Sequence, residues 1–512
     1  MILARNTAWI RFRSAQEGQC RSQWSGSAVL SVALLVVAGA AAPVHGQTYS
    51  VLHSFGGSDG AAPQSALIMD TSGNLYGTTA NGGSGNYGTA FKLDSSATLT
   101  TLANLSTSSG DGYGPYAGLV LYAGNLYGTT YQGGAYYNGT VFKIDSNGVF
   151  STVYNFPGGT EGAHPAAALV ADTAGNLYGT TYSGGTSNGT VFELNPTSGT
   201  LTWSYALSYS DGAFPEAGLI LDSTGANLYG TAYFGGTSGQ GTIFTLTTSG
   251  TGFTVRHSFS GNDGGNPYGG LVRDSSGNLY GTTVYGGSTG YGTVFKLDTS
   301  AVLTTLYAFT NGADGANPNA GVVIDGAGNL YGVAEYGGNT SATGCQGSYF
   351  APPGCGTVYE LMASSSNPPT YSFKLVHTFT YSDGGNPFAG LFIDPTGNLY
   401  GTTLYGGTPS SGNPAGTVYK IAVESPQAMI LALIGQVNAL LQSGVLNSGR
   451  ANSLVTHLQK ALSTLGKSNT TPTISLLQVF INEVQGMENA GALAPTDAQS
   501  LIDAANAVIA LL

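Results

Sequence analysis

Seven acidic residues recur at one position of a tandem repeat, where carboxylates could hold cations or hydroxyl-rich ligands. Each acid precedes a glycine, and a proline follows four residues after the acid, as in Asp263, Gly264 and Pro267. Asp-Gly pairs also form tight turns in which the carboxylate caps its own backbone. A residue type present in every copy favours this architectural interpretation over a ligand-binding ring. The seven acids, the turn acids, are Asp59, Asp111, Glu161, Asp211, Asp263, Asp314 and Asp383.

Aromatic residues that vary between copies lie just before a Gly-Gly pair of the repeat. Rings stack on sugar faces and other apolar planes, so variation in this loop predicts a ligand-binding surface. Packing between adjacent repeats is the competing interpretation. The first copy has Ala80 and Asn81 there instead. The aromatic candidates are Tyr131, Tyr182, Tyr233, Phe234, Tyr285, Tyr336 and Tyr405.

Groups for catalysis are sparse. His53, His257 and His377 share one repeat position and are interpreted as packing residues, whereas His164 lies in an acidic turn. The sequence has no Gly-x-Ser-x-Gly elbow with a matching histidine and no His-x-x-x-His metal motif. Opposed turn acids could in principle cleave a glycosidic bond, but nothing singles out a pair. We therefore expect no catalytic residues, no cofactor and no metal. Carboxylates are suitable ligands for Ca²⁺, but nothing else in the sequence supports a Ca²⁺ site at the turn acids.

The repeat that carries these residues is marked by Asn-Leu-Tyr-Gly. The first five intervals between its tyrosines are 51 residues each, and the sixth is 69. A fixed period of this size indicates one supersecondary unit that is copied and stacked. The tyrosines are Tyr76, Tyr127, Tyr178, Tyr229, Tyr280, Tyr331 and Tyr400.

Each repeat predicts four short antiparallel strands, which is typical of a propeller blade. In the fifth copy the strands are expected at 270–274, 278–283, 292–297 and 302–309. The last copy lacks a fourth strand, and Thr48 to Phe55 at the other end of the array has the pattern of one. We predict an all-β, seven-bladed β-propeller over residues 47–422, closed by its N-terminal strand. An open solenoid would need polar caps at both ends.

Gly-Asn-Leu-Tyr-Gly-Thr-Thr, the following Gly-Gly and Gly-Thr-Val-Phe-Lys-Leu resemble the GloVer tandem repeats of exported bacterial proteins with interchangeable anchors. The resemblance covers about residues 48–422 and supports the repeat class. It says almost nothing about activity, because that family is defined by its repeats.

The N-terminal segment is typical of export. Arg5, Arg11, Arg13 and Arg21 precede an apolar stretch from about Ala28 to Ala42. We interpret residues 1–46 as a secretory signal peptide, and a retained membrane anchor is the alternative. The mature chain is expected outside the cell or at its surface, with no transmembrane span.

The net charge of −12 makes nucleic acid an unexpected partner, because lysine and arginine hold its phosphates. Cys345 and Cys355 lie in one expanded loop of an exported chain, so they predict a disulfide rather than a metal site.

Residues 423–512 predict a four-helix bundle, because apolar residues fall on one face of each of four segments. Thr496 and Gln499 are expected to form a capping box at the start of the last helix. Leu477 to Val484 and the closing Ala504 to Leu512 resemble the FIMAH helical domain of secreted bacterial proteins. That resemblance implies a module that docks to the propeller or to another protein.

Together these features favour a secreted, non-catalytic propeller that binds a carbohydrate, peptide or protein. Two alternatives stay open: a polysaccharide-degrading enzyme that uses ring carboxylates, and a purely structural surface protein.

Overall fold

The computed structural model describes residues 47–512 except for 108–109, 343, 346–351, 365, 367, 424–425 and 466–469. The predicted export segment, residues 1–46, lies outside the described residues.

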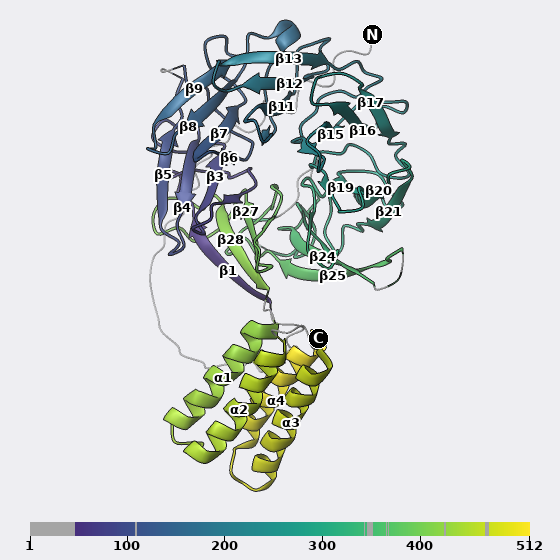
Figure 1. The fold of residues 1–512 in the computed structure, drawn as a ribbon. Coiled ribbons are helices and arrows are strands. Elements are labelled where there is room, and N and C mark those ends of the chain that lie inside the picture. Colours follow the sequence, from purple (N-terminus) through teal and green to yellow (C-terminus); the bar gives the residue numbers. More distant parts are fainter. Residues whose placement is uncertain are drawn as a thin grey trace, which may run out of the picture. The chain divides into compact units, whose positions relative to one another are not determined.

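The described residues form seven four-stranded antiparallel sheets, arranged in a ring as the blades of a propeller (Figure 1). Blades 1 to 3 are β2 (Ile68–Met69), β3 (Leu75–Thr79), β4 (Thr89–Leu93), β5 (Leu99–Asn104); β6 (Val120–Tyr122), β7 (Asn125–Thr130), β8 (Thr140–Ile144), β9 (Phe150–Asn155); and β10 (Val170–Ala171), β11 (Leu177–Thr181), β12 (Thr190–Asn195), β13 (Thr200–Ala206).

Blades 4 to 7 follow the same strand order. They are β14 (Ile220–Leu221), β15 (Asn227–Ala232), β16 (Thr242–Thr247), β17 (Thr254–Ser258); β18 (Val272–Arg273), β19 (Leu279–Thr283), β20 (Thr293–Leu297), β21 (Leu303–Ala308); β22 (Val323–Ile324), β23 (Leu330–Ala334), β24 (Thr357–Ala363), β25 (Tyr371–Thr378); and β26 (Phe392–Ile393), β27 (Leu399–Thr403), β28 (Thr417–Val423), β1 (Gln47–Ser54).

The N-terminal strand closes the ring, as predicted. β1 pairs with β28 from Gln47 opposite Val423 to Ser54 opposite Thr417, and it supplies the fourth strand of blade 7. Tyr49 of β1 also stacks on the His377 ring of blade 6, with ring centroids 3.8 Å apart. Closure removes the two strand edges that an open array would expose.

The repeated motif has a physical role at each position, as the fifth copy shows. Asp274 begins a turn in which its carboxylate accepts hydrogen bonds from the Asn278 backbone at 2.9 Å and side chain at 2.7 Å. The Tyr280 hydroxyl donates to the same carboxylate at 3.1 Å. A Cβ on Gly281 would lie 2.7 Å from the buried Phe295 ring, so the glycine lets this ring pack on the second strand. The motif therefore combines an Asx turn with a packing site for the third strand.

The first strand of each blade is shorter than the sequence predicts. In blade 5 it is Val272–Arg273 instead of residues 270–274. The preceding segment approaches its neighbour in blade 6, since a Cβ on Gly269 would meet the Gly321 nitrogen at 2.2 Å. Innermost segments converge near the propeller axis, and this close approach accompanies the early end of their sheet pairing.

The C-terminal residues form four helices, as predicted: α1 (Pro426–Gln442), α2 (Ser448–Leu465), α3 (Thr470–Asn489) and α4 (Pro495–Ala510). They share one hydrophobic core, which includes Leu433, Leu458, Phe480 and Leu501. No helix among the described residues is long and apolar enough to cross a membrane.

The predicted cap of the last helix is wrong. Helix α4 begins at Pro495, one residue earlier than predicted, so its N-cap residue is Ala494, whose methyl side chain cannot accept a cap hydrogen bond. The Gln499 side chain donates to Asp503 at 2.7 Å instead of reaching back to the helix start.

Candidate functional site

One face of the propeller gathers both sets of residues that the sequence singled out. Each connection between blades forms an isolated backbone bridge to the loop between the second and third strands. We call this face, made of the blade connections and the Gly-Gly loops, the loop face. The bridges are Ala61–Asn81, Tyr113–Gln132, Ala163–Ser183, Ala213–Phe234, Gly265–Tyr285, Ala316–Tyr336 and Gly385–Tyr405.

The turn acids on this face accept hydrogen bonds from their own turns. The Asp263 carboxylate accepts a hydrogen bond from the Ser260 backbone N–H at 2.9 Å. It also lies 2.8 Å from the Nε2 atom of His257. Burial alone would raise the pKa of Asp263, but these hydrogen bonds outweigh it and hold the pKa below its ordinary value. Asp314 likewise accepts the backbone N–H groups of Thr310 at 2.8 Å and Gly312 at 3.1 Å. These contacts are those expected of a repeated turn.

The other turn acids follow this pattern with local variation. Asp59 accepts from Gly56, Asp211 from Ser208 and Asp383 from Thr380, each through a backbone N–H. The Asp111 carboxylate accepts a hydrogen bond from the Ser106 hydroxyl at 3.4 Å, and burial raises the pKa of Asp111. Glu161, in the short helix η1 (Gly159–Glu161), accepts the Tyr154 hydroxyl. In these contacts each turn acid is bonded to groups of its own turn or of the strand before it.

A second partner of most turn acids comes from the outermost strand of the preceding blade. His53, His257 and His377 contact Asp59, Asp263 and Asp383 through Nε2 at 2.8, 2.8 and 3.1 Å. Tyrosine replaces histidine at this position in three other blades, and Ala103 occupies it in blade 1. The tyrosines are Tyr154, Tyr205 and Tyr307. The histidines therefore bind the turns as well as pack, and the repeated spacing of six or seven residues to the acid was the signal in the sequence.

The aromatic candidates separate into two positions with different surroundings. Phe234, Tyr285, Tyr336 and Tyr405 occupy the bridged position directly before Gly-Gly. Tyr131, Tyr182 and Tyr233 precede that position by one residue, and successive side chains of extended chain point to opposite sides. The aromatic candidates, one set in the sequence pattern, therefore occupy two different positions in the structure.

The earlier position contributes to a cluster that includes residues the sequence analysis did not single out. Tyr233 lies 5.9 Å from Tyr268 and Tyr131 lies 6.2 Å from Tyr182, measured between ring centroids. Burial raises the pKa of Tyr268, and the nearby carboxylates of Glu216 and Glu335 raise it further. We call this group the axial cluster: Glu216, Glu335, Tyr131, Tyr182, Tyr233 and Tyr268.

Its place near the propeller axis follows from contacts that skip a blade. Glu216, Tyr268 and Phe388 each follow the repeated proline, in blades 4, 5 and 7. The Tyr268 and Phe388 rings are 5.3 Å apart although blade 6 lies between their blades in the ring. Only residues close to the axis can meet in this way. The equivalent residues in the other blades are Gln64, Tyr116, Ala166 and Asn319.

His164 lies beside this cluster. Its Nδ1 is 2.9 Å from the Ser183 hydroxyl, its ring is 5.0 Å from that of Tyr131, and burial lowers its pKa. A neutral histidine in these contacts helps to position the loop.

Exposed tyrosines concentrate on the loop face. Tyr137 is 76% exposed and Tyr136 is 58% exposed, both in the Gly-Gly loop of blade 2. Every tyrosine classed as exposed among the described residues lies in a Gly-Gly loop or a blade connection. They are Tyr87, Tyr116, Tyr136, Tyr137, Tyr209, Tyr285 and Tyr291.

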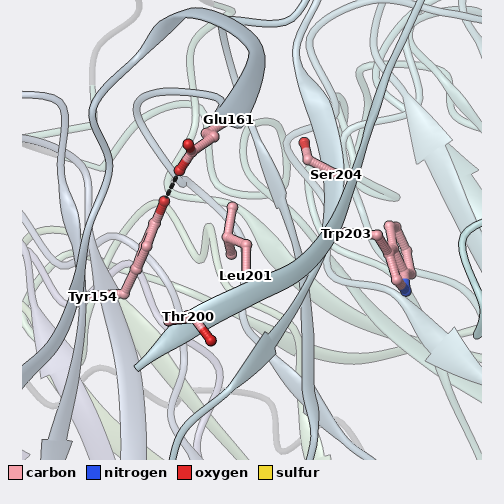
Figure 2. Close-up of a pocket in the computed structure, with 6 residues that line it drawn as sticks. All are labelled: Tyr154, Glu161, Thr200, Leu201, Trp203 and Ser204. Atoms are coloured by element: carbon pink, nitrogen blue, oxygen red, sulfur yellow. Dashed lines mark hydrogen bonds between the residues drawn. The ribbon is translucent and has the colours of Figure 1, made fainter. Parts of the chain in front are cut away.

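An open groove of about 370 Å³ lies beside Glu161. Figure 2 shows the Tyr154–Glu161 hydrogen bond with Leu201 next to it. Thr200, Trp203 and Ser204 of β13 complete the lining, and the Trp203 indole donates to the Thr248 carbonyl at 3.0 Å. The indole N–H is thus already engaged within the protein.

Cys345 and Cys355 form a disulfide with their Cα atoms 4.9 Å apart, in the expanded Gly-Gly loop of blade 6. Within the described ranges, no three His, Cys, Asp or Glu side chains form a group that could hold a metal ion.

The seven closed blades define the class of this protein, a seven-bladed β-propeller followed by four helices. The chain belongs to the Gloeobacter/Verrucomicrobia repeat family, whose pattern matches residues 42–227, 188–345 and 220–459. This match confirms the tandem repeat, whereas the FIMAH resemblance of the helices stays a prediction.

Solved structures with a similar arrangement share little sequence with this chain. Hydrazine synthase of Kuenenia stuttgartiensis aligns with a TM-score of 0.48 and 16% identity over 72% of this chain and 97% of its own. A gluconolactonase of Xanthomonas campestris aligns with a TM-score of 0.33 and 12% identity over 58% of this chain and 81% of its own. No curated protein matches the sequence.

Proposed function

We propose that this chain is an exported, non-catalytic binding propeller whose loop face holds carbohydrate. The observation that supports this is the placement of the exposed tyrosines on the loop face. A tyrosine ring offers an apolar plane for the face of a sugar and a hydroxyl for its rim. The propeller would supply the rigid frame, and the loops would supply the specificity.

Carbohydrate is favoured over a protein partner because the exposed rings are distributed over separate loops. Tyr87, Tyr137, Tyr209 and Tyr291 belong to four different connections, with small polar residues and glycines around them. A protein interface core is usually a more continuous apolar patch. Separated rings suit successive sugar units along a chain.

A glycan array followed by calorimetry with the best-bound glycan tests the proposal. The loop-face variant replaces both Tyr136 and Tyr137 with alanine, in blade 2. The matched control is Val149→Ala. Val149 is 59% exposed and lies in the hairpin between β8 and β9 of the same blade, away from the Gly-Gly loop. Loss of affinity in the tyrosine variant alone supports the proposal. Equal affinity in all three proteins, or capture of proteins but no glycan, contradicts it.

Cleavage of the bound polysaccharide is the alternative that the residues left open. The structure gives the turn acids local hydrogen-bond partners, and it favours no pair of them as acid and nucleophile. Reducing-end release from the best-bound glycan by the wild-type chain would support hydrolysis over simple binding.

Export is part of the proposal and has its own test. Residues 1–46 have the composition of a signal peptide, so the mature chain is expected to begin near Gln47. N-terminal sequencing of the protein recovered outside the cells checks this, and an intact residue 1 would contradict it.

A further inference from the structure

We propose that the axial cluster is a binding site for an organic ammonium group. None of its members is one of the exposed tyrosines, and the site does not depend on carbohydrate binding. Blades 4, 5 and 6 bring the groups of this site together around Tyr268.

Two carboxylates face the same tyrosine. The carboxylates of Glu216, in blade 4, and Glu335, in blade 6, both act electrostatically on the Tyr268 hydroxyl. Glu335 is 4% exposed, and its carboxylate accepts a hydrogen bond from the Asn319 side-chain amide. No lysine, arginine or histidine forms an ion pair with Glu216 within the described ranges. A positive ligand would therefore meet a Glu216 carboxylate that none of these ion pairs includes.

The remaining members of the cluster are aromatic and present their rings at steep angles. Tyr233 and Tyr268 are inclined by 88°, and Tyr131 and Tyr182 by 60°. Tyr182, Tyr233 and Tyr268 are partly accessible to solvent, as is Glu216. Ring faces attract cations, most strongly where water is partly excluded. Inclined rings beside a carboxylate are the arrangement that recognises alkylated ammonium groups.

Other ligand classes fit this cluster less well. Ca²⁺ takes six to eight oxygen ligands, and no group of three potential metal-ligating side chains occurs in the described part of the chain. An anion would be repelled by the two carboxylates. An ammonium group with methyl or methylene substituents uses both the charge and the apolar ring faces.

Proton binding by Glu216 gives the site a measurable pH dependence. Burial raises the pKa of Glu216 to about 7, and the Tyr268 hydroxyl partly opposes this rise. The groups that face Glu216 are the hydroxyls of Tyr131, Tyr182, Tyr233 and Tyr268, while Glu335 lies against Tyr268 and neutral His164 lies against Tyr131. Glu216 is thus ionised above neutral pH and protonated below it. A permanent cation should bind more tightly as the pH rises.

Choline is the probe, and 3,3-dimethylbutan-1-ol is its neutral isostere. Calorimetric titration of the full chain at about pH 8.5 should show binding of choline at least about tenfold tighter than that of the alcohol. Below about pH 7 the choline affinity should fall roughly tenfold per pH unit, because one proton competes with the cation.

Three variants locate the effect. Glu216→Gln keeps the side-chain shape and should weaken choline binding at least about tenfold while removing the pH dependence. Glu161→Gln, at the exposed turn acid of blade 3, is the control and should bind as the wild type does. Tyr268→Phe keeps the ring but loses the hydroxyl that lowers the pKa of Glu216, so the midpoint of the pH dependence should move to higher pH.

Thermal melts of each variant separate misfolding from loss of the site. Equal binding of choline and the alcohol, no choline binding at tens of millimolar, or unchanged affinity in a folded Glu216→Gln would each overturn the proposal. None of these outcomes concerns glycan binding by the outer tyrosines, which Tyr136 and Tyr137 test separately.

Discussion

Replacing Tyr359 and Tyr419 with phenylalanine is expected to stabilise the propeller. Both side chains are fully buried, and neither hydroxyl has a hydrogen-bond partner among the described residues. Each hydroxyl lies over the glycine of the second strand: a Cβ on Gly332 would be 2.3 Å from the Tyr359 oxygen. The five other blades have phenylalanine at this position, namely Phe91, Phe142, Phe192, Phe244 and Phe295.

The magnitude follows from the cost of an unpaired buried hydroxyl. Burying such a group without a partner costs about 1–3 kcal/mol, and the phenylalanine ring keeps nearly all of the packing. Each substitution should therefore raise the free energy of unfolding by about 1 kcal/mol or more. The two sites lie in different blades, so the effects should be close to additive.

Urea unfolding followed by fluorescence measures the effect as a shift of the midpoint at constant slope. Tyr331→Phe is the matched control, because the Tyr331 hydroxyl shares its single proton between the carboxylates of Asp325 and Glu360, each 3.1 Å away. That variant should lose about 1–3 kcal/mol, since hydrogen bonds to charged groups are the stronger ones. A loss of stability in Tyr359→Phe or Tyr419→Phe would refute the reasoning and would indicate a bound water as the missing partner.

Three further changes test closure, packing and electrostatics. Tyr49→Ala removes the ring that stacks on His377 across the closing seam and should lower the free energy of unfolding by about 3–5 kcal/mol, as measured by urea titration. Gly281→Ala places a methyl group 2.7 Å from the Phe295 ring and should lower the melting temperature through a loss of about 1–3 kcal/mol. Burial tends to raise the pKa of Asp222, but the hydrogen bonds it accepts outweigh this and lower the pKa to about 2. Its stabilising contribution is present above the ordinary value of 3.8 and is lost as the pH falls towards 2, so Asp222→Asn should reduce the acid sensitivity of the urea midpoint in that window.

Controls for these changes lie on the surface of the same chain. Tyr137→Ala removes an exposed ring and should leave the free energy of unfolding nearly unchanged, so a loss equal to that of Tyr49→Ala would argue against the seam contact as the cause. Gly326→Ala places its methyl group in open space and should be neutral or slightly stabilising. If Asp222→Asn lost stability equally at neutral and acidic pH, the turn geometry rather than the charge would be responsible.

The repeat in the sequence was sufficient to predict the blades. Asn-Leu-Tyr-Gly at a fixed period predicts identical local units, because an Asx turn, a bonded tyrosine and a glycine under a ring are all short-range requirements. The missing last strand and the matching N-terminal strand predicted closure in the same way. The predicted cap at Thr496 was wrong, because α4 already begins at Pro495.

The candidate site was only partly accessible to sequence reasoning. The sequence identified the loops, since Gly-Gly and Asp-Gly mark turns wherever they occur. It could not separate Tyr182 and Tyr233 from Tyr285, because a shift of one residue along extended chain reverses the side to which a ring points. Glu216 and Tyr268 follow the repeated proline, and the varied chemistry at that position was the available signal.

The amino-acid sequence by itself therefore determined the unit, its number of copies and the way the ring closes, because those depend on contacts between residues near in the chain or matched in pattern. The tertiary structure alone decided which side chains meet at the axis. Glu216, Tyr268 and Glu335 belong to three blades, and they meet only because the closed ring directs the inner edge of every blade to the same small space.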